Sequence, residues 1–195
     1  IVVANHIMKI VHQNGVYRTI ECRQISSVNY SFTIVTTPRY LAYFGDMGSY
    51  VFSRNTAIDV LGFFRNTTRT GEEIPYGYWA EKLEAGDYKQ FDAQTAVAQA
   101  VTMLEQEESL NLAACDYSSL DEIKELLEGA AEDGENEYFA ALSDLVDELE
   151  VDDWYEHCQR VYKPTYHYIW CCYAILWTIA QYDSTENKEQ QNEQV

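Results

Sequence analysis

The sequence predicts an α+β fold, in which an antiparallel sheet of four to five strands is followed by helices packed on or beside it. Residues 7–53 are β-prone runs separated by glycine turns, whereas apolar residues recur at helical spacing after Asn55. Strands first and helices afterwards is the order typical of an α+β layout. With 47% apolar and 14% aromatic residues, the 195-residue chain can bury a sizeable core.

Two glycine turns organise the expected sheet. The pair Asn14-Gly15, inside the β-prone residues 7–22, is a strong hairpin signal and predicts a type I′ turn. The segment Gly45–Gly48 predicts a second hairpin, because glycine tolerates the backbone reversal that a tight turn requires. The remaining expected strands are Tyr30–Thr36, Tyr40–Phe44 and Ser49–Ser53.

Helices are expected from Asn55 onwards. Thr56 and Asp59 have capping-box spacing, and Ile58, Leu61 and Phe64 form an apolar stripe after them. The further expected helices are Tyr78–Leu83, Ala93–Glu107, one that begins after the Ser119–Glu122 capping box, one that begins after Gly134, and about Tyr166–Tyr182.

The composition bounds the domain organisation and the compartment. Residues 1–70, the basic sheet portion, and residues 71–183, the acidic helical portion, are expected to form one compact domain. Residues 184–195 are expected to form a disordered tail.

The longest apolar run, Ile169–Ala180, would span about 18 Å as a helix, which is too short to cross a ~30 Å hydrocarbon core. Because no signal peptide is visible and Cys171-Cys172 lies in this apolar run, we expect a protein of the reducing cytoplasm, not of a membrane.

The charge is divided unevenly along the chain. Residues 105–156 contain 19 acidic residues and a single base, Lys124, so that −18 of the total of −19 arises there. The first 70 residues have a charge of +4. A localised negative field attracts basic partners and repels nucleic acid, so we expect a protein partner with a basic surface and no direct nucleic-acid binding.

The acidic helices are the predicted contact surface. Eighteen charges over a length on the order of 30 Å average about one per 2 Å, close to the one per ~1.7 Å of duplex DNA. A merely solvated face would contain interleaved lysines, because like charges at i, i+4 destabilise a helix. The predicted contact residues are Glu122, Glu125, Glu128, Asp144, Asp147, Glu148, Asp152 and Asp153.

Motifs for catalysis are missing. The chain has no Gly-x-Ser-x-Gly, Walker, Rossmann or calcium-loop pattern, so no enzyme and no cofactor are expected. The alternative is an enzymatic or small-ligand site at the Gly45–Gly48 turn, formed by Asp46 with Trp79 and Glu81. His167 and Cys171, at i, i+4, could form half a zinc site, but so apolar a helix favours buried thiols, and no metal is expected.

The arginines of the first 70 residues, with Tyr17, Tyr30, Tyr40, Tyr43 and Tyr50, could form a nucleic-acid platform, which the negative field of the rest disfavours. We expect the arginines to pair with the chain's own acidic helices, or to form the interface of a homodimer.

Several segments resemble a family of small proteins encoded by tailed phages and prophages. The matching segments are Gly15-Val-Tyr-Arg18, Tyr40-Leu-Ala-Tyr-Phe-Gly-Asp-Met-Gly-Ser-Tyr-Val-Phe-Ser-Arg54, Phe63-Phe-Arg65, Gly77-Tyr-Trp-Ala-Glu-Lys-Leu83, Trp170-Cys-Cys-Tyr-Ala174 and Tyr182-Asp183. They cover both ends of the chain, whereas residues 100–150 match nothing in the family.

The resemblance implies a phage origin and a host cytoplasmic location, and it implies no mechanism. Phage accessory proteins of this size often act on a host protein. Together with the acidic segment, the resemblance predicts a non-enzymatic inhibitor of a host protein, such as a nucleic-acid-dependent defence system. A phage structural or assembly protein is the further alternative.

Overall fold

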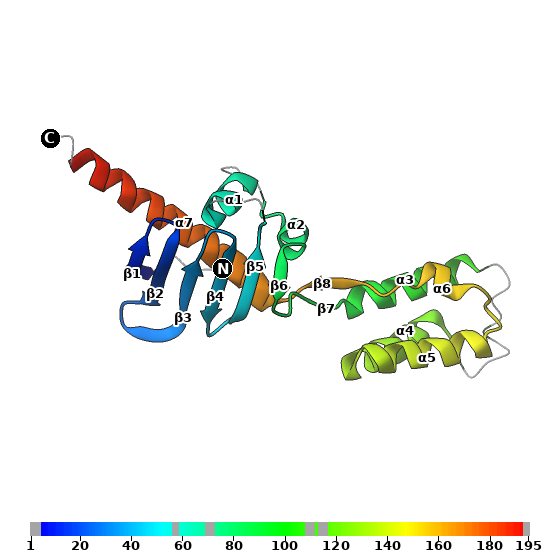
Figure 1. The fold of residues 1–195 in the computed structure, drawn as a ribbon. Coiled ribbons are helices and arrows are strands. Elements are labelled where there is room, and N and C mark those ends of the chain that lie inside the picture. Colours follow the sequence, from blue (N-terminus) through cyan, green and yellow to red (C-terminus); the bar gives the residue numbers. More distant parts are fainter. Residues whose placement is uncertain (1–4, 56–58, 69–72, 108–111, 113–116, 193–195) are drawn as a thin grey trace. The chain divides into compact units, whose positions relative to one another are not determined.

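The computed structural model describes residues 5–55, 59–68, 73–107, 112 and 117–192. The chain divides into two compact units (Figure 1). Residues 1–88 and 164–195 form the sheet unit, and residues 89–163 form the helical unit. The helical unit is therefore an insertion within the sheet unit, and each is described by itself below.

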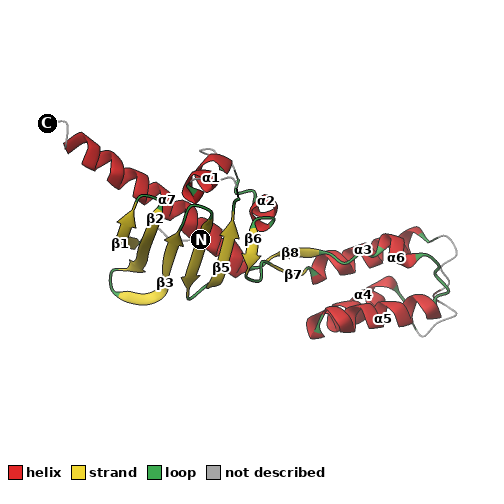
Figure 2. Ribbon diagram, viewed as in Figure 1, coloured by secondary structure: helices red, strands yellow, loops and turns green. Residues whose placement is uncertain are grey.

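The sheet unit contains a six-stranded antiparallel sheet in which every strand pairs with its neighbours in the sequence, in the order β1-β2-β3-β4-β5-β6 (Figure 2). This confirms the predicted α+β class. The strands are β1 (His6–Asn14), β2 (Tyr17–Gln24), β3 (Ser27–Thr36), β4 (Tyr40–Gly45), β5 (Gly48–Ser53) and β6 (Leu83–Ala85).

The first hairpin forms at the predicted place with a different turn. Asn14 pairs with Tyr17, so the corner residues are Gly15 and Val16, and of these only Gly15 has a positive φ, of 59°. The predicted type I′ turn, which needs a positive φ at both central residues, is therefore wrong; glycine at the first corner position is typical of type II′.

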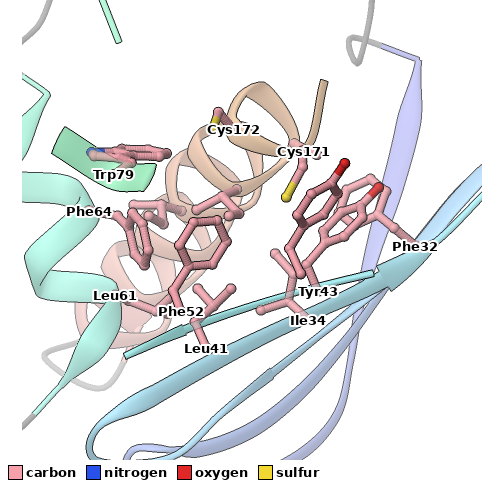
Figure 3. Packing of buried hydrophobic residues seen from close by; sticks show 14 of the residues in the cluster. Phe32, Ile34, Leu41, Tyr43, Phe52, Leu61, Phe64, Trp79, Cys171 and Cys172 are labelled. Carbon is pink, nitrogen blue, oxygen red and sulfur yellow. The ribbon is translucent and has the colours of Figure 1, made fainter. Parts of the chain in front are cut away.

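One long helix, α7 (Tyr166–Asn192), covers one face of the sheet. Its buried face includes Tyr168, Cys171, Ile175 and Ile179, which recur every three to four residues, as the packing of one helix face requires. They meet inward side chains of alternate strand positions, including Phe32, Ile34, Leu41, Tyr43 and Phe52 (Figure 3). The prediction ends this helix near Tyr182, whereas the structure continues it through residues 184–192 of the expected tail.

Two short helices complete the sheet unit. Helix α1 (Val60–Thr67) begins after the N-cap Asp59, whose carboxylate accepts a hydrogen bond from the Leu61 amide at 3.1 Å. The other two residues of the predicted helix start, Thr56 and Ile58, lie outside the described residues. Helix α2 (Tyr76–Ala80) buries Trp79, which packs edge-to-face on Phe64 at 4.5 Å between ring centroids.

The helical unit has its own apolar core. It consists of α3 (Ala93–Gln106), α4 (Leu120–Asp133), α5 (Glu135–Glu148), α6 (Trp154–His157) and the strand pair β7 (Lys89–Phe91) and β8 (Tyr162–Pro164). Gly134, with φ 146°, connects α4 directly to α5, as predicted, because glycine adopts this conformation without strain. The fully buried side chains include Leu104, Ile123, Leu127, Leu142 and Val146.

The division of the chain differs from the predicted one. The predicted boundary near residue 70 assigns all later helices to one acidic portion, whereas the helical unit ends at Lys163 and α7 returns to the sheet unit. Within the sheet unit, the Thr165 amide donates to the Tyr88 carbonyl at 2.9 Å. The residues where the chain leaves the sheet unit and re-enters it are therefore adjacent, as an inserted unit requires.

Tyr43 provides a test of the sheet-unit core. Its side chain is fully buried, and its hydroxyl has no hydrogen-bond partner among the described residues. The equally buried Tyr168 instead donates its hydroxyl proton to the Tyr76 carbonyl at 2.9 Å. We expect Tyr43→Phe to raise the free energy of unfolding by about 1 kcal/mol and Tyr168→Phe to lower it by about 1 kcal/mol, as measured by urea unfolding. Equal losses for both variants would contradict this difference in hydrogen bonding.

Candidate functional site

The negative charge of the chain is concentrated in the helical unit. This unit has 20 acidic and 4 basic residues, a formal charge of −16, whereas the sheet unit has 12 acidic and 9 basic residues, a charge of −3. The insertion therefore contains 75 of the 195 residues and most of the net charge. This separation makes the helical unit the candidate functional site.

The contacts within the helical unit define a strand end and a distal end. Helix α3 begins directly after β7, and the Tyr138 hydroxyl near the start of α5 donates to the Ala96 carbonyl near the start of α3 at 2.8 Å. The starts of α3 and α5 therefore lie at the strand end, together with the last turn of α4, which connects to α5 through Gly134. The distal end consists of the last turns of α3 and α5, the first turn of α4, and α6, where Cys158 contacts Met103.

Three of the four bases of this unit lie at the strand end. The Lys163 ammonium donates to Asp92 at 2.9 Å, and Arg160 forms an ion pair with Glu135. Lys89 lies 4.3 Å from the ring centroid of Tyr162. Hydrogen bonds from Lys163 and Thr95 lower the pKa of Asp92, and hydrogen bonds from Tyr162 and Arg160 lower the pKa of Glu135. At the strand end, the carboxylates of Asp92 and Glu135 are thus compensated within the unit, whereas Glu132, Asp133 and Glu137 are further exposed acids there.

The distal end has a different charge balance. The nearest lysine or arginine is Lys124, just after the first turn of α4, whose ammonium lies 3.8 Å from a Glu128 carboxylate oxygen, and α6 contains His157. No basic residue lies in the last turn of α3 or of α5, although each contains acids. Helix C-termini have a partial negative charge, so acids there are unfavourable by roughly 0.3–1 kcal/mol each at low ionic strength.

All eight predicted contact residues are exposed. Glu122, Glu125 and Glu128 lie on α4, Asp144, Asp147 and Glu148 on α5, and Asp152 and Asp153 between α5 and α6. Glu150 and Glu156, next to Asp152 and Asp153, and Asp121 on α4 are also exposed and are not among the eight, although they belong to the same acidic run. Exposure is a requirement for contact with a partner, and the contacts themselves stay a prediction.

Glu122 also has a structural role at the start of α4. Its carboxylate accepts hydrogen bonds from the Ser118 amide at 2.9 Å and the Ser118 hydroxyl at 2.8 Å, and these bonds lower its pKa. The Ser119 hydroxyl accepts from the Glu122 amide at 3.3 Å. The predicted capping box therefore forms, with Ser118 in place of Ser119 as the residue that the glutamate contacts.

Two arginines of the sheet unit pair within that unit, contrary to the prediction that they pair with the acidic helices. Arg18 is buried and donates two hydrogen bonds to Asp59, at 3.0 and 3.1 Å, and one to the Tyr182 hydroxyl at 3.2 Å. Arg65 likewise donates to both carboxylate oxygens of Asp183. Tyr43 and Tyr50 are buried, so these two side chains do not contribute to an aromatic and basic platform, the alternative that the sequence disfavours.

The alternative ligand site consists of residues with structural roles. Asp46 accepts a hydrogen bond from the Ser31 amide at 3.3 Å at the turn between β4 and β5. Trp79 is fully buried, and its indole N–H donates to the Thr67 hydroxyl at 2.9 Å. Glu81 is exposed and pairs with Lys82 at 3.1 Å. These contacts account for Asp46 as a turn residue and for Trp79 as a core residue.

The described thiols are protected by burial. Burial raises the pKa of Cys22 and Cys172 to about 12 and that of Cys158 to about 11. Cys171 is also fully buried, whereas Cys115 lies outside the described residues. A thiol with such a pKa stays protonated at neutral pH and is a poor nucleophile or metal ligand. Within the described ranges, no group of three or more His, Cys, Asp or Glu residues could hold a metal ion.

None of the helices in the described part of the chain, including α7, combines the length and apolar character needed to cross a membrane. Comparisons with protein-family models, with curated proteins and with solved structures found no match. The binding mode proposed below is therefore inferred from the contacts, burial and charges of this chain.

Proposed function

We propose that this chain is a phage-encoded, non-enzymatic inhibitor that binds a basic surface of a host protein through the acidic face of its helical unit. The observation that carries the proposal is the segregation of charge in that unit: exposed acids lie along α4 and α5 and at the distal end, while three of its four bases lie at the strand end. The phage origin rests on the sequence resemblance alone.

The charge density supports a DNA-mimicking form of this binding. Helices α4 and α5 are antiparallel. Each has 14 residues, which corresponds to a helix length of about 21 Å. Residues 120–148 contain 11 acids and Lys124, a charge of −10, or about one charge per 2 Å of that length. Duplex DNA has about one per 1.7 Å. A cleft that binds DNA phosphates would therefore meet a similar density of negative charge, so we propose a nucleic-acid-dependent defence protein as the target.

The placement of the acids favours binding over solvation. A surface that served solubility alone would combine acids with lysines at i, i+4, which stabilises a helix by ~0.2–0.5 kcal/mol per pair. Here Lys124–Glu128 is the one such pair among the described ion pairs. Acids at the C-terminal ends of α3 and α5 add a further cost through the helix dipole. Residues that lower the stability of a helix are typical of functional surfaces.

Capture from a bacterial lysate tests this proposal. The tagged full chain is incubated with lysate at low salt, bound proteins are identified by mass spectrometry, and the complex is then challenged with duplex DNA. The proposal predicts one dominant nucleic-acid-binding protein that DNA releases. A bound protein that DNA cannot displace would overturn the mimicry, and the absence of any bound protein in lysates of suitable hosts would overturn the inhibitor function.

A further inference from the structure

A groove lies on the outward side of helix α3 in the helical unit, beside α6. It has a volume of about 310 Å³, and its lining includes Ala98, Gln99, Thr102, Met103 and Gln106 of α3 and His157 of α6. Ala98, Thr102 and Gln106 recur every four residues, on the side of α3 opposite the buried Ala100 and Leu104. Helix α6 lies against α3 here (Figure 1), where the Cys158 thiol contacts the Met103 sulfur at 3.7 Å. We call this feature the α3 groove.

The α3 groove is neutral within an acidic unit. No acid, lysine or arginine is among the described residues that line it. Residues 93–104 contain no charged residue, whereas seven of the 14 residues of α4 are charged. The exposed acids Glu105 and Glu156 are the chain neighbours of the lining residues Gln106 and His157. The groove is therefore an uncharged recess in a unit with a formal charge of −16.

The lining includes an acceptor that lacks a donor. The side-chain oxygen of Gln99 is buried and has no hydrogen-bond partner among the described residues. A buried acceptor without a partner lowers stability, so a ligand that donates a hydrogen bond to it is favoured. The last torsion of a glutamine side chain is broad, so the carboxamide can turn its oxygen toward a donor in the groove. The ligand that fits is therefore a hydrogen-bond donor.

Charge and lining together indicate an arginine side chain. The negative field of the unit attracts cations and repels anions such as nucleotides. A guanidinium is a planar donor that stacks on rings such as the His157 imidazole, and it is less strongly hydrated than the ammonium of lysine. Its aliphatic stem can pack beside Ala98 and Met103. We propose that the α3 groove binds an arginine side chain, contributed by the target protein.

This inference rests on the proposed inhibitor function and adds specificity to it. The acids of α4 and α5 attract any basic surface, whereas a groove for one planar cation selects among such surfaces. The volume lies at the lower end of the range of about 300–1,000 Å³ for ligand sites, so the groove accommodates one side chain. Arginines that insert into pockets are often among the residues that contribute most to binding.

Chemical-shift titration of the full chain tests this site without a host protein. The ¹⁵N-labelled chain is titrated with N-acetyl-arginine methylamide and, separately, with N-acetyl-lysine methylamide, which has the same charge. We expect saturable shifts of the Ala98, Gln99 and Thr102 amides with the arginine compound, at the millimolar concentrations typical of so small a ligand. The lysine compound should bind at least ~5-fold more weakly, because an ammonium is more strongly hydrated and does not stack.

A matched pair of variants tests the groove itself. Thr102→Trp fills the groove with an indole at an exposed position, and Gln94→Trp places the same side chain at an exposed position of α3 outside the lining. Neither variant changes the net charge. We expect Thr102→Trp to weaken binding of the arginine compound and of the captured host protein at least ~10-fold each, and Gln94→Trp to change neither by more than ~2-fold. Unchanged far-UV circular dichroism would show that both variants remain folded, and the comparison of arginine with lysine in the unaltered chain does not depend on them.

The outcomes separate this site from the inhibitor function. Equal shifts with the two compounds, or an arginine affinity that Thr102→Trp does not change, would overturn the arginine site. The inhibitor function would survive that result if duplex DNA still released the captured protein. Conversely, an arginine-selective groove in a chain that captures no host protein would support the site and overturn the inhibitor function alone.

Discussion

Neutralising four acids of the helical unit is expected to weaken binding to the captured host protein about 100-fold. The variant combines Glu125→Gln, Glu128→Gln, Asp144→Asn and Asp147→Asn, all at exposed positions of α4 and α5. Each change alone should cost less than about threefold, because the charges act together at long range. The affinity of the purified complex, measured by titration calorimetry, gives the comparison.

A matched variant separates this surface from overall charge. Glu73, Glu81, Glu84 and Asp87 are exposed acids of the sheet unit, and their amide replacements change the net charge by the same amount. We expect less than a threefold loss of affinity for this control. Equal losses for the two variants would show that total charge, and not the acidic face of the helical unit, determines binding. Neutralising acids near helix C-termini should also raise the stability of the helical unit.

Asp59→Ala is expected to lower the free energy of unfolding by about 3–5 kcal/mol. Arg18 is only 7% exposed, and Asp59 contacts two of its guanidinium nitrogens. Removing the carboxylate leaves a buried guanidinium without its ionic partner, which is a severe loss. The substitution also removes the N-cap of α1, which contributes about 1 kcal/mol. Denaturant unfolding monitored by tryptophan fluorescence measures the change.

Asp183→Ala is the control for this prediction. Asp183 forms the same two-point contact with Arg65, but the two side chains are 36% and 39% exposed. Exposed ion pairs contribute about 0–1 kcal/mol, so we expect a loss of at most about 1 kcal/mol. A loss for Asp59→Ala no larger than that for Asp183→Ala would contradict the role assigned to burial.

Local signals predicted much of the fold. Neighbouring residues determine the turn at Gly15, the break at Gly134 and the cap at Ser119. These features can therefore be predicted from a short segment of the sequence. Strand β6 was missed because its three residues, Leu83–Ala85, form a strand only through pairing with β5, far earlier in the chain. Pairing between distant segments leaves no short-range pattern.

The partners of the arginines were also beyond local prediction. Arg18 and Asp59 are 41 residues apart, and Arg65 and Asp183 are 118 apart, so nothing in the sequence near either arginine indicates its carboxylate. The boundary of the helical unit depends in the same way on the adjacency of Tyr88 and Thr165. The exposure of the acids, by contrast, follows from helical periodicity, because the apolar residues of α4 and α5 fix which face is buried.

The measurement that tests electrostatic binding most directly is the salt dependence of the dissociation constant for the full chain and the captured host protein. Binding through an acidic surface that competes with DNA predicts a linear rise of log Kd with log salt concentration, with a weakening of at least ~100-fold between about 50 and about 200 mM salt. An affinity that is nearly constant over this range would contradict the account, even if the captured protein is the true partner.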